Sequence, residues 1–170
     1  MPNYKGHIVG GLVTFVIAFF VLSTFLKTKM PKNYSELFLL LLICVLGALF
    51  PDIDIKSKGQ RIFYLILLII LTWSVYANNL VILAVASISG FIPLLSRHRG
   101  ITHRTWFVVL APLLVPIVAS QQNIYLSQKA TTAYYFFVAG GLSHLILDFG
   151  FIKTLKYSIP KRKKQYRRWK

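Results

Sequence analysis

Cysteine and acidic residues are scarce in this chain of 170 residues. The single cysteine, Cys44, lies in an apolar run, so the chain has neither an intrachain disulfide framework nor a cysteine zinc cluster. Only 4 Asp and Glu residues oppose 20 Lys and Arg residues, which gives a formal net charge of +16. Charged residues make up 14% of the chain, against about 25% in a typical soluble domain, and hydrophobic residues make up 56%. This composition excludes a disordered basic chain and is typical of a small multi-pass membrane protein with basic loops.

Alternation of apolar and polar residues is also missing, which makes a membrane β-barrel a poor fit. The apolar residues gather instead in six stretches, which we expect to be helices because a helix satisfies its backbone polar groups internally. The first is long enough to cross a bilayer, whereas the others have about 14 to 17 residues, fewer than the roughly 20 that a full crossing needs. The sequence therefore predicts an all-α fold, a multi-pass membrane bundle of about five to six helices. The expected helices are 8–26, 36–50, 62–77, 80–95, 106–119 and 133–149.

Two of these stretches, 36–50 and 106–119, are the weakest candidates for crossing and could instead be re-entrant. Pro112 and Pro116 should kink the second of them, because proline removes a helix hydrogen bond. The following segment, 120–132, is rich in polar residues, and we expect it to be a loop.

Basic residues are unevenly divided between the two sides of the predicted bundle. If all six stretches cross, 16 Lys and Arg residues lie on the side that carries both termini and 4 lie on the other. If 36–50 dips and returns, the division becomes 18 to 2 and the N-terminus changes side. Because basic loops stay inside, we expect a cytoplasmic (inner) membrane protein with cytoplasmic termini. It would consist of a membrane-embedded helical domain, 1–152, and a basic cytoplasmic tail, 153–170.

The chemically capable side chains gather at one end of the predicted helices. The chain has four histidines and four acidic residues, and all except Glu36 fall at the helix ends that the charge division places in the cytoplasm. Taken singly, each is explained as well or better as a solvated loop residue, an interfacial residue or half of a hydrogen-bonded pair. Their gathering favours a metal cluster. Its candidate members are His7, Asp52, Asp54, His98, His103, His144 and Asp148.

His144 and Asp148 are four residues apart, which places them on one helix face with Cβ atoms ~5–6 Å apart. An ionisable group in or beside an apolar run is costly unless it is paired or metal-bound. Asp148 also lies at a helix C-terminus, the unfavourable end of the helix dipole for an acid. A bound cation would offset both costs, although a simple hydrogen-bonded pair fits the spacing as well. Gly140 and Gly141, one turn earlier, would let another helix approach closely.

Histidine nitrogen and aspartate oxygen, without thiolate, suit Zn²⁺, Mn²⁺ or Fe²⁺. Seven candidates exceed the four ligands of one zinc ion, so two ions bridged by a carboxylate are an alternative to a single ion. Two-metal sites act on phosphoryl groups. Four basic residues flank the candidates and could hold a phosphate, although the charge division between the loops explains them equally well. They are Lys56, Arg61, Arg97 and Arg99.

The motifs that carry these residues resemble those of a known family. They are Gly6-His7, then Leu49-Phe50-Pro51-Asp52-Ile53-Asp54 with Ser57 and Gly59-Gln60-Arg61 after it, His98-Arg99-Gly100-Ile101-Thr102-His103, and Gly141-Leu142-Ser143-His144 with Asp148. The chain is similar to the YdjM-type inner-membrane proteins, a family regarded as metal-dependent hydrolases. That family is thought to be distantly similar to zinc-dependent phospholipase C, an all-helical fold with a His/Asp metal cluster. The resemblance implies metal ligands at His7, Asp52, His103, His144 and Asp148, with Asp54 and His98 as further members.

We therefore expect a membrane-bound metal-dependent hydrolase of phosphoesters, with a phospholipid headgroup as the favoured substrate. The expected cofactor is Zn²⁺, one ion or two, with Mn²⁺ and Fe²⁺ as alternatives. Asp54 is the candidate for orienting the attacking water, and Arg99 for holding the phosphate. The main alternative is a non-catalytic membrane anchor with a structural metal, whose basic tail binds anionic lipid or nucleic acid. A cation transporter fits less well, because its ionisable residues should lie near the middle of the membrane.

Overall fold

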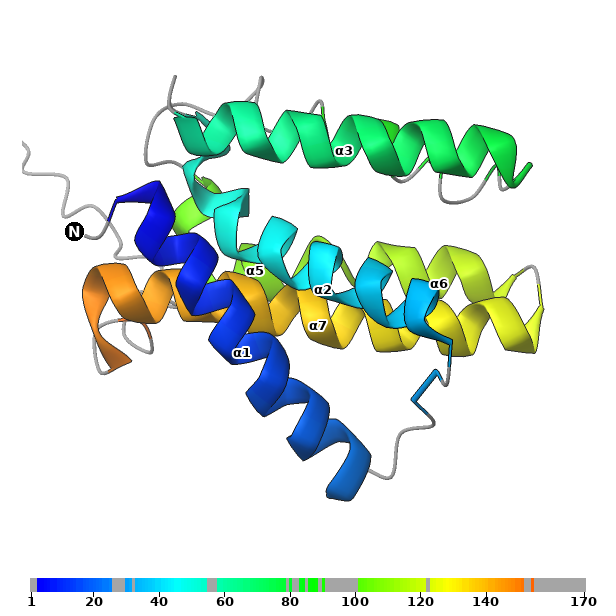
Figure 1. Cartoon of the computed structure of the whole chain (residues 1–170), viewed down its shortest axis with the longest axis horizontal. Coiled ribbons are helices and arrows are strands. Elements are labelled where there is room, and N and C mark those ends of the chain that lie inside the picture. Colours follow the sequence, from blue (N-terminus) through cyan, green and yellow to red (C-terminus); the bar gives the residue numbers. More distant parts are fainter. Residues whose placement is uncertain are drawn as a thin grey trace, which may run out of the picture.

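The computed structural model is all-helical, as the sequence predicts, and the part of the chain that it describes contains no strand. The described residues are 3–25, 30–31, 33–54, 58–78, 80, 83–84, 86–88, 90, 101–121, 123–151 and 154. Figure 1 shows the arrangement of the α-helices. Two short 3₁₀ helices accompany them; η1 follows α2 directly and η2 precedes α5. The bounds are α1 Tyr4–Thr24, α2 Tyr34–Leu49, η1 Phe50–Asp54, α3 Lys58–Tyr76, η2 Ile101–His103, α5 Thr105–Leu110, α6 Leu114–Ser120 and α7 Ile124–Phe149.

Four of the described helical segments are long and apolar enough to cross a membrane, as expected for a multi-pass protein. They are Tyr4–Thr24, Tyr34–Ile53, Lys58–Tyr76 and Ile124–Phe149. The stretch 36–50 is longer than expected, since α2 together with η1 gives 20 residues of mean hydropathy 2.3, which is enough to cross. Whether it crosses or is re-entrant stays open. The segment Thr105–Ser120 is shorter, and 80–95 is described only in part. The total number of crossings and their orientation therefore stay predictions.

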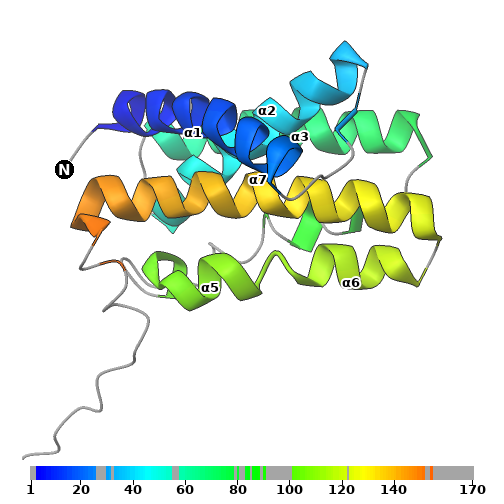
Figure 2. The ribbon, with the colours of Figure 1, turned by 90° about the horizontal axis from the view of Figure 1, so that it is seen from below.

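Helix α7 lies between α1 and α2 on one side and α5 and α6 on the other (Figure 2). It runs parallel to α2, because Glu36 pairs with Lys129 where both helices begin and Ala48 contacts His144 where both approach their ends. Helix α1 runs antiparallel to both, and its Gly11 accepts a hydrogen bond from the Cys44 thiol at 3.4 Å. This topology brings the beginning of α1 to the ends of α2 and α7.

The contact between α2 and α7 is close because Gly140 has no side chain. A Cβ atom at this position would collide with the carbonyl oxygen of Cys44 and come within 2.9 Å of the Ala48 nitrogen. Small residues let membrane helices pack backbone against backbone in this way. Gly141 faces the other neighbour, and the Val108 side chain of α5 fills the space next to it. The predicted packing role of both glycines is confirmed.

The predicted distortion of 106–119 at Pro112 is confirmed and is larger than a kink, because α5 and α6 are separate helices. The chain leaves the helical conformation at Ala111–Leu113, where the proline ring at Pro112 opposes continuation of α5. Pro116 does not break α6. It lies in the first turn, where the missing N–H would have had no helix partner.

The prediction of a loop over 120–132 is wrong, because α7 begins at Ile124 rather than near residue 133. Asn123 caps the helix by accepting a hydrogen bond from the Leu126 N–H at 2.7 Å. The polar residues that follow lie inside the helix, and Thr132 satisfies its hydroxyl by donating to the carbonyl oxygen of Gln128. The helix is therefore long enough to span, with a polar first half.

Candidate metal centre

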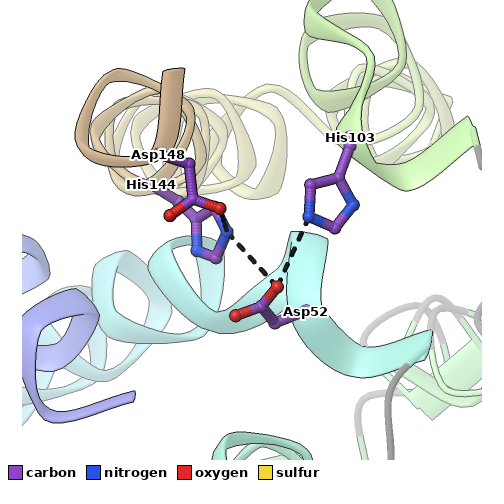
Figure 3. A group of neighbouring side chains, drawn as sticks. All are labelled: Asp52, His103, His144 and Asp148. Atoms are coloured by element: carbon purple, nitrogen blue, oxygen red, sulfur yellow. Dashed lines mark ion pairs between the residues drawn. The ribbon is translucent and has the colours of Figure 1, made fainter. Parts of the chain in front are cut away.

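Four ligand side chains meet at the end of the bundle where α1 begins and α2 and α7 end. Asp52 lies in η1, His103 is the last residue of η2, and His144 and Asp148 lie in the last two turns of α7. One ligand atom from each of the four lies within 4.8 Å of the others. Figure 3 shows the side chains pointing toward a common centre from three elements that are far apart in the sequence.

The distances between the ligand atoms suit a small divalent ion. Nε2 of His103 lies 3.4 Å from Oδ1 of Asp52. Nε2 of His144 lies 3.6 Å from the same oxygen and 3.5 Å from Oδ2 of Asp148. Ligand atoms about 2.1 Å from a tetrahedral zinc ion are about 3.4 Å from one another. The donors therefore fit such an ion, and two imidazoles with two carboxylates suit Zn²⁺, Mn²⁺ or Fe²⁺.

Burial leaves this group in need of a positive partner. The side chains of His144, Asp148 and His103 are 0%, 4% and 5% exposed, whereas Asp52 is 28% exposed. Among the described residues, Nε2 of His144 and Oδ1 of Asp148 receive or make no hydrogen bond. Buried polar atoms without such bonds are costly, and when the imidazoles are neutral the two carboxylates carry two uncompensated negative charges. A divalent cation would satisfy both the atoms and the charge.

The backbone of α2 orients His144. Its Nδ1–H donates to the carbonyl oxygen of Ala48 at 2.7 Å, which leaves the lone pair on Nε2, the nitrogen that faces the aspartates. Ala48 belongs to the last turn of α2, where carbonyl groups lack their full set of helix partners. Pro51, three residues further on, has no N–H to offer. The proline after α2 thus removes the i+3 competitor for the carbonyl that the histidine uses.

Two further polar side chains support the turns that carry ligands. Gln60 of α3 donates from Nε2 to the carbonyl oxygen of Ile53 at 2.8 Å, which holds η1 next to Asp52. The buried Thr102 hydroxyl lies 3.4 Å from Nδ1 of His103, so its interaction is with the ring nitrogen that faces away from the aspartates. Both residues position ligands, and both stand inside or beside the motifs that sequence analysis singled out.

Thr154 ties the end of α7 to α5. Its buried hydroxyl donates to the carbonyl oxygen of Leu145 at 3.0 Å, and its own carbonyl oxygen accepts a bond from the Thr105 hydroxyl at 2.9 Å. Sequence reasoning missed Thr154 and the Ala48 carbonyl. Neither carries a sequence signal, since one is a threonine in a basic segment and the other acts through its backbone.

His7 lies beside the group of four. Its Nε2 is 3.5 Å from Oδ1 of Asp148 and 4.0 Å from Oδ2 of Asp52. Its ring stacks on that of His144, with centroids 3.8 Å apart and planes inclined by 17°. The side chain is 1% exposed. Helix α1 therefore places His7, its only histidine, beside the same group of ligands.

The remaining predicted site residues lie outside the described part of the chain or are described only in their backbone. His98 and Arg99 fall in 91–100, and Asp54 ends η1 without a described side chain. Arg61 is exposed on α3. Of the tail 153–170 only Thr154 is described. The roles assigned to Asp54, His98 and Arg99, and the division into two domains, stay predictions.

Glu36, the one acid that the sequence sets apart, lies at the other end of the bundle. Its Oε1 is 2.6 Å from Nζ of Lys129, which in turn lies over the ring of Tyr125 at 4.4 Å. Lys129 lies within α7, so it is not the loop residue that the predicted loop over 120–132 implied. Among the acids whose side chains are described, Asp52 and Asp148 thus lie with histidines and Glu36 lies with a lysine.

Comparison with known proteins places nearly the whole chain in one family. The sequence profile described as YdjM inner membrane protein matches residues 1–167. No curated protein and no solved structure matches the chain. The implied similarity to zinc-dependent phospholipase C stays a prediction.

Proposed function

The chain belongs to the YdjM inner membrane protein family, and from that premise we propose that it is a membrane-bound, metal-dependent hydrolase of phosphoesters. The favoured substrate class is a phospholipid headgroup. The observation that carries the proposal is the convergence of Asp52, His103, His144 and Asp148, whose ligand atoms lie within 4.8 Å of one another.

The partial exposure of one ligand favours a catalytic rather than a purely structural ion. A structural zinc site is closed, whereas a catalytic site keeps a position for water or substrate. Asp52 is the one ligand with substantial exposure, at 28%, so the centre can be reached from its side. When bound, a divalent metal would polarise a phosphoryl oxygen and make a bound water more acidic.

The remaining chemistry belongs to the chain's own side chains. The Ala48 carbonyl and Thr102 hold the two histidines in place, so that no reorientation is needed when a substrate arrives. Asp54 and Arg99 are our candidates for orienting the attacking water and for holding the phosphate, because their motifs adjoin Asp52 and His103 in the sequence.

The position of the centre favours a lipid substrate. All four ligands lie at ends of helices, or next to them, and α2 with η1 and α7 are long enough to span the hydrocarbon core. Helix ends of such spans lie at the level of the lipid headgroups. A phosphoester at that depth would meet the centre without leaving the membrane.

Elemental analysis of the purified full-length protein, combined with a phosphodiesterase assay, tests the proposal. The wild type should carry metal in stoichiometric amount and hydrolyse a soluble phosphodiester or a phospholipid. Each of four ligand variants should lose metal and activity while still inserting into the membrane, since removing a charge does not oppose insertion. A double variant should be little worse than a single one, because the ligands act as a unit. The variants are Asp52→Asn, His103→Ala, His144→Ala and Asp148→Asn.

Glu36→Gln is the matched control, because it makes the same carboxylate-to-amide change at the opposite end of the bundle and should leave metal and activity intact. A wild type without stoichiometric metal, and ligand variants that behave like it, would overturn the proposal. A wild type that holds metal, hydrolyses no phosphoester and binds anionic lipid through its tail would replace it with the membrane-anchor alternative.

A further inference from the structure

We infer that the centre binds two divalent cations, the second held by His7 together with one oxygen from each of Asp52 and Asp148. The inference deepens the proposed function and rests on it for the first ion. Its basis is the way in which the two carboxylates divide their oxygens between His7 and the other histidines.

Each aspartate directs one carboxylate oxygen toward His7 and the other toward the histidines of the group of four. For Asp52, Oδ1 lies 3.4 Å from Nε2 of His103 and 3.6 Å from Nε2 of His144, while Oδ2 lies 4.0 Å from Nε2 of His7. For Asp148, Oδ2 lies 3.5 Å from Nε2 of His144, while Oδ1 lies 3.5 Å from Nε2 of His7. A carboxylate that bridges two ions divides its oxygens in this way.

The two stacked imidazoles have the spacing that a pair of ions requires. The rings of His7 and His144 are 3.8 Å apart and nearly parallel, and both direct Nε2 toward oxygens of the same two aspartates. Two-metal sites hold their ions about 3.5–4 Å apart. The histidines thus lie side by side at the separation of such ions.

His7 is held in this position by the fold. Asn3 caps α1 by accepting a hydrogen bond from the Gly6 N–H at 3.2 Å, which fixes the first helical turn. His7 itself is 1% exposed. The group of four already supplies ligands for one ion, and a further ligand from His7 would occupy the position that a catalytic ion keeps for water or substrate.

Charge indicates what a second ion would add. One divalent cation neutralises the two aspartates when the imidazoles are neutral. A second cation leaves two positive charges in a buried site, which attract an anion strongly because the local dielectric is low. The inferred centre therefore favours a phosphate ester over an uncharged ester or amide.

The test is metal loading of the full-length protein in metal-free detergent buffer, with Mn²⁺ as the probe. We expect two Mn²⁺ per chain in the wild type and one in His7→Gln, a neutral variant of similar size. The electron paramagnetic resonance spectrum should be that of an exchange-coupled pair in the wild type and of an isolated ion in the variant. Val9→Ala, on the same helix and 58% exposed, is the matched control and should bind two ions.

The outcomes separate this inference from the proposed function. One Mn²⁺ per wild-type chain, unchanged in His7→Gln and without exchange coupling, overturns the second site and leaves the hydrolase proposal intact. No bound Mn²⁺ and no bound Zn²⁺ in the wild type overturns both. The wild-type stoichiometry and spectrum decide the number of ions even if the variant fails to fold.

Discussion

Replacing Gly140 with alanine should loosen the joint between α2 and α7 and, through it, the metal centre. The new Cβ would meet backbone atoms of α2, the carbonyl oxygen of Cys44 and the nitrogen of Ala48 at 2.9 Å. Backbone atoms cannot rotate away as a side chain can, so the two helices must separate. The separation acts directly on His144, whose Nδ1 bonds to the carbonyl of Ala48 at 2.7 Å.

Three contributions set the size of the effect. Overpacking costs about 1–3 kcal/mol, and leaving the buried His144 nitrogen without its acceptor costs about 1–3 kcal/mol. The higher helix propensity of alanine relative to glycine offsets this by about 1 kcal/mol. The net destabilisation is therefore about 1–5 kcal/mol, which lowers the apparent Tm by at least about 2 °C for a chain of this size. A misplaced supporting group typically lowers metal affinity about 10–100-fold.

Gly10→Ala is the control, because its Cβ would meet only Cδ1 of Leu147, the far end of a flexible side chain, at 2.7 Å. Rotating that side chain costs about 0.5–1.5 kcal/mol, which the gain in helix propensity of about 1 kcal/mol offsets. Tryptophan fluorescence during heating and metal titration measure both variants. Equal Tm values and equal metal affinities for the two would refute the packing argument.

Three further predictions concern the membrane topology, the basic tail and the ion pair at the opposite end of the bundle. Single cysteines introduced at Ser57, Arg99 and Tyr166 should react with a thiol reagent only from the cytoplasmic side. Labelling of any of them from outside intact cells would contradict the predicted orientation. The native Cys44 should stay unlabelled in the folded protein, because it is fully buried. Removal of 161–170 should weaken salt-sensitive binding to anionic vesicles, at ~1 kcal/mol for each basic residue near the surface, and a parallel loss of metal would show that the tail supports the site. Lys129→Met should cost no more than about 1 kcal/mol in unfolding free energy, because its ion pair with Glu36 is exposed.

The meeting of histidines and aspartates could be predicted because it depends on helix periodicity and on which end of the bundle each motif occupies. Spacing places His144 and Asp148 on one helix face, and the division of basic residues places the motifs of Asp52 and His103 at the same end. Neither argument says which helices are neighbours. The parallel contact of α2 with α7, which gives His144 its backbone acceptor, depends on tertiary packing and has no signature of its own.

Errors in the predicted fold arose where hydropathy was the only guide. The beginning of α7 is polar, yet Thr132 is buried and bonds to the carbonyl oxygen of Gln128 in its own helix. A hydropathy pattern assigns such residues to a loop, whereas Asn123 followed by a run without proline or glycine would have indicated a capped helix. Over 106–119 the sequence locates the distortion at Pro112 but not its size, since a proline can either kink a helix or end it.

The order in which the ligands are synthesised determines when, during synthesis and membrane insertion, the ligand set becomes complete. Asp52 is made early, and roughly 100 residues of chain separate it from Asp148, which at about 5–20 residues per second is a delay of about 5–20 s. A chain that ends before α7 carries only two of the four clustered ligands, Asp52 and His103. A metal ion held by all four ligands would therefore require α7 to lie between its neighbours. A bound ion would accordingly mark chains in which α7 is in place.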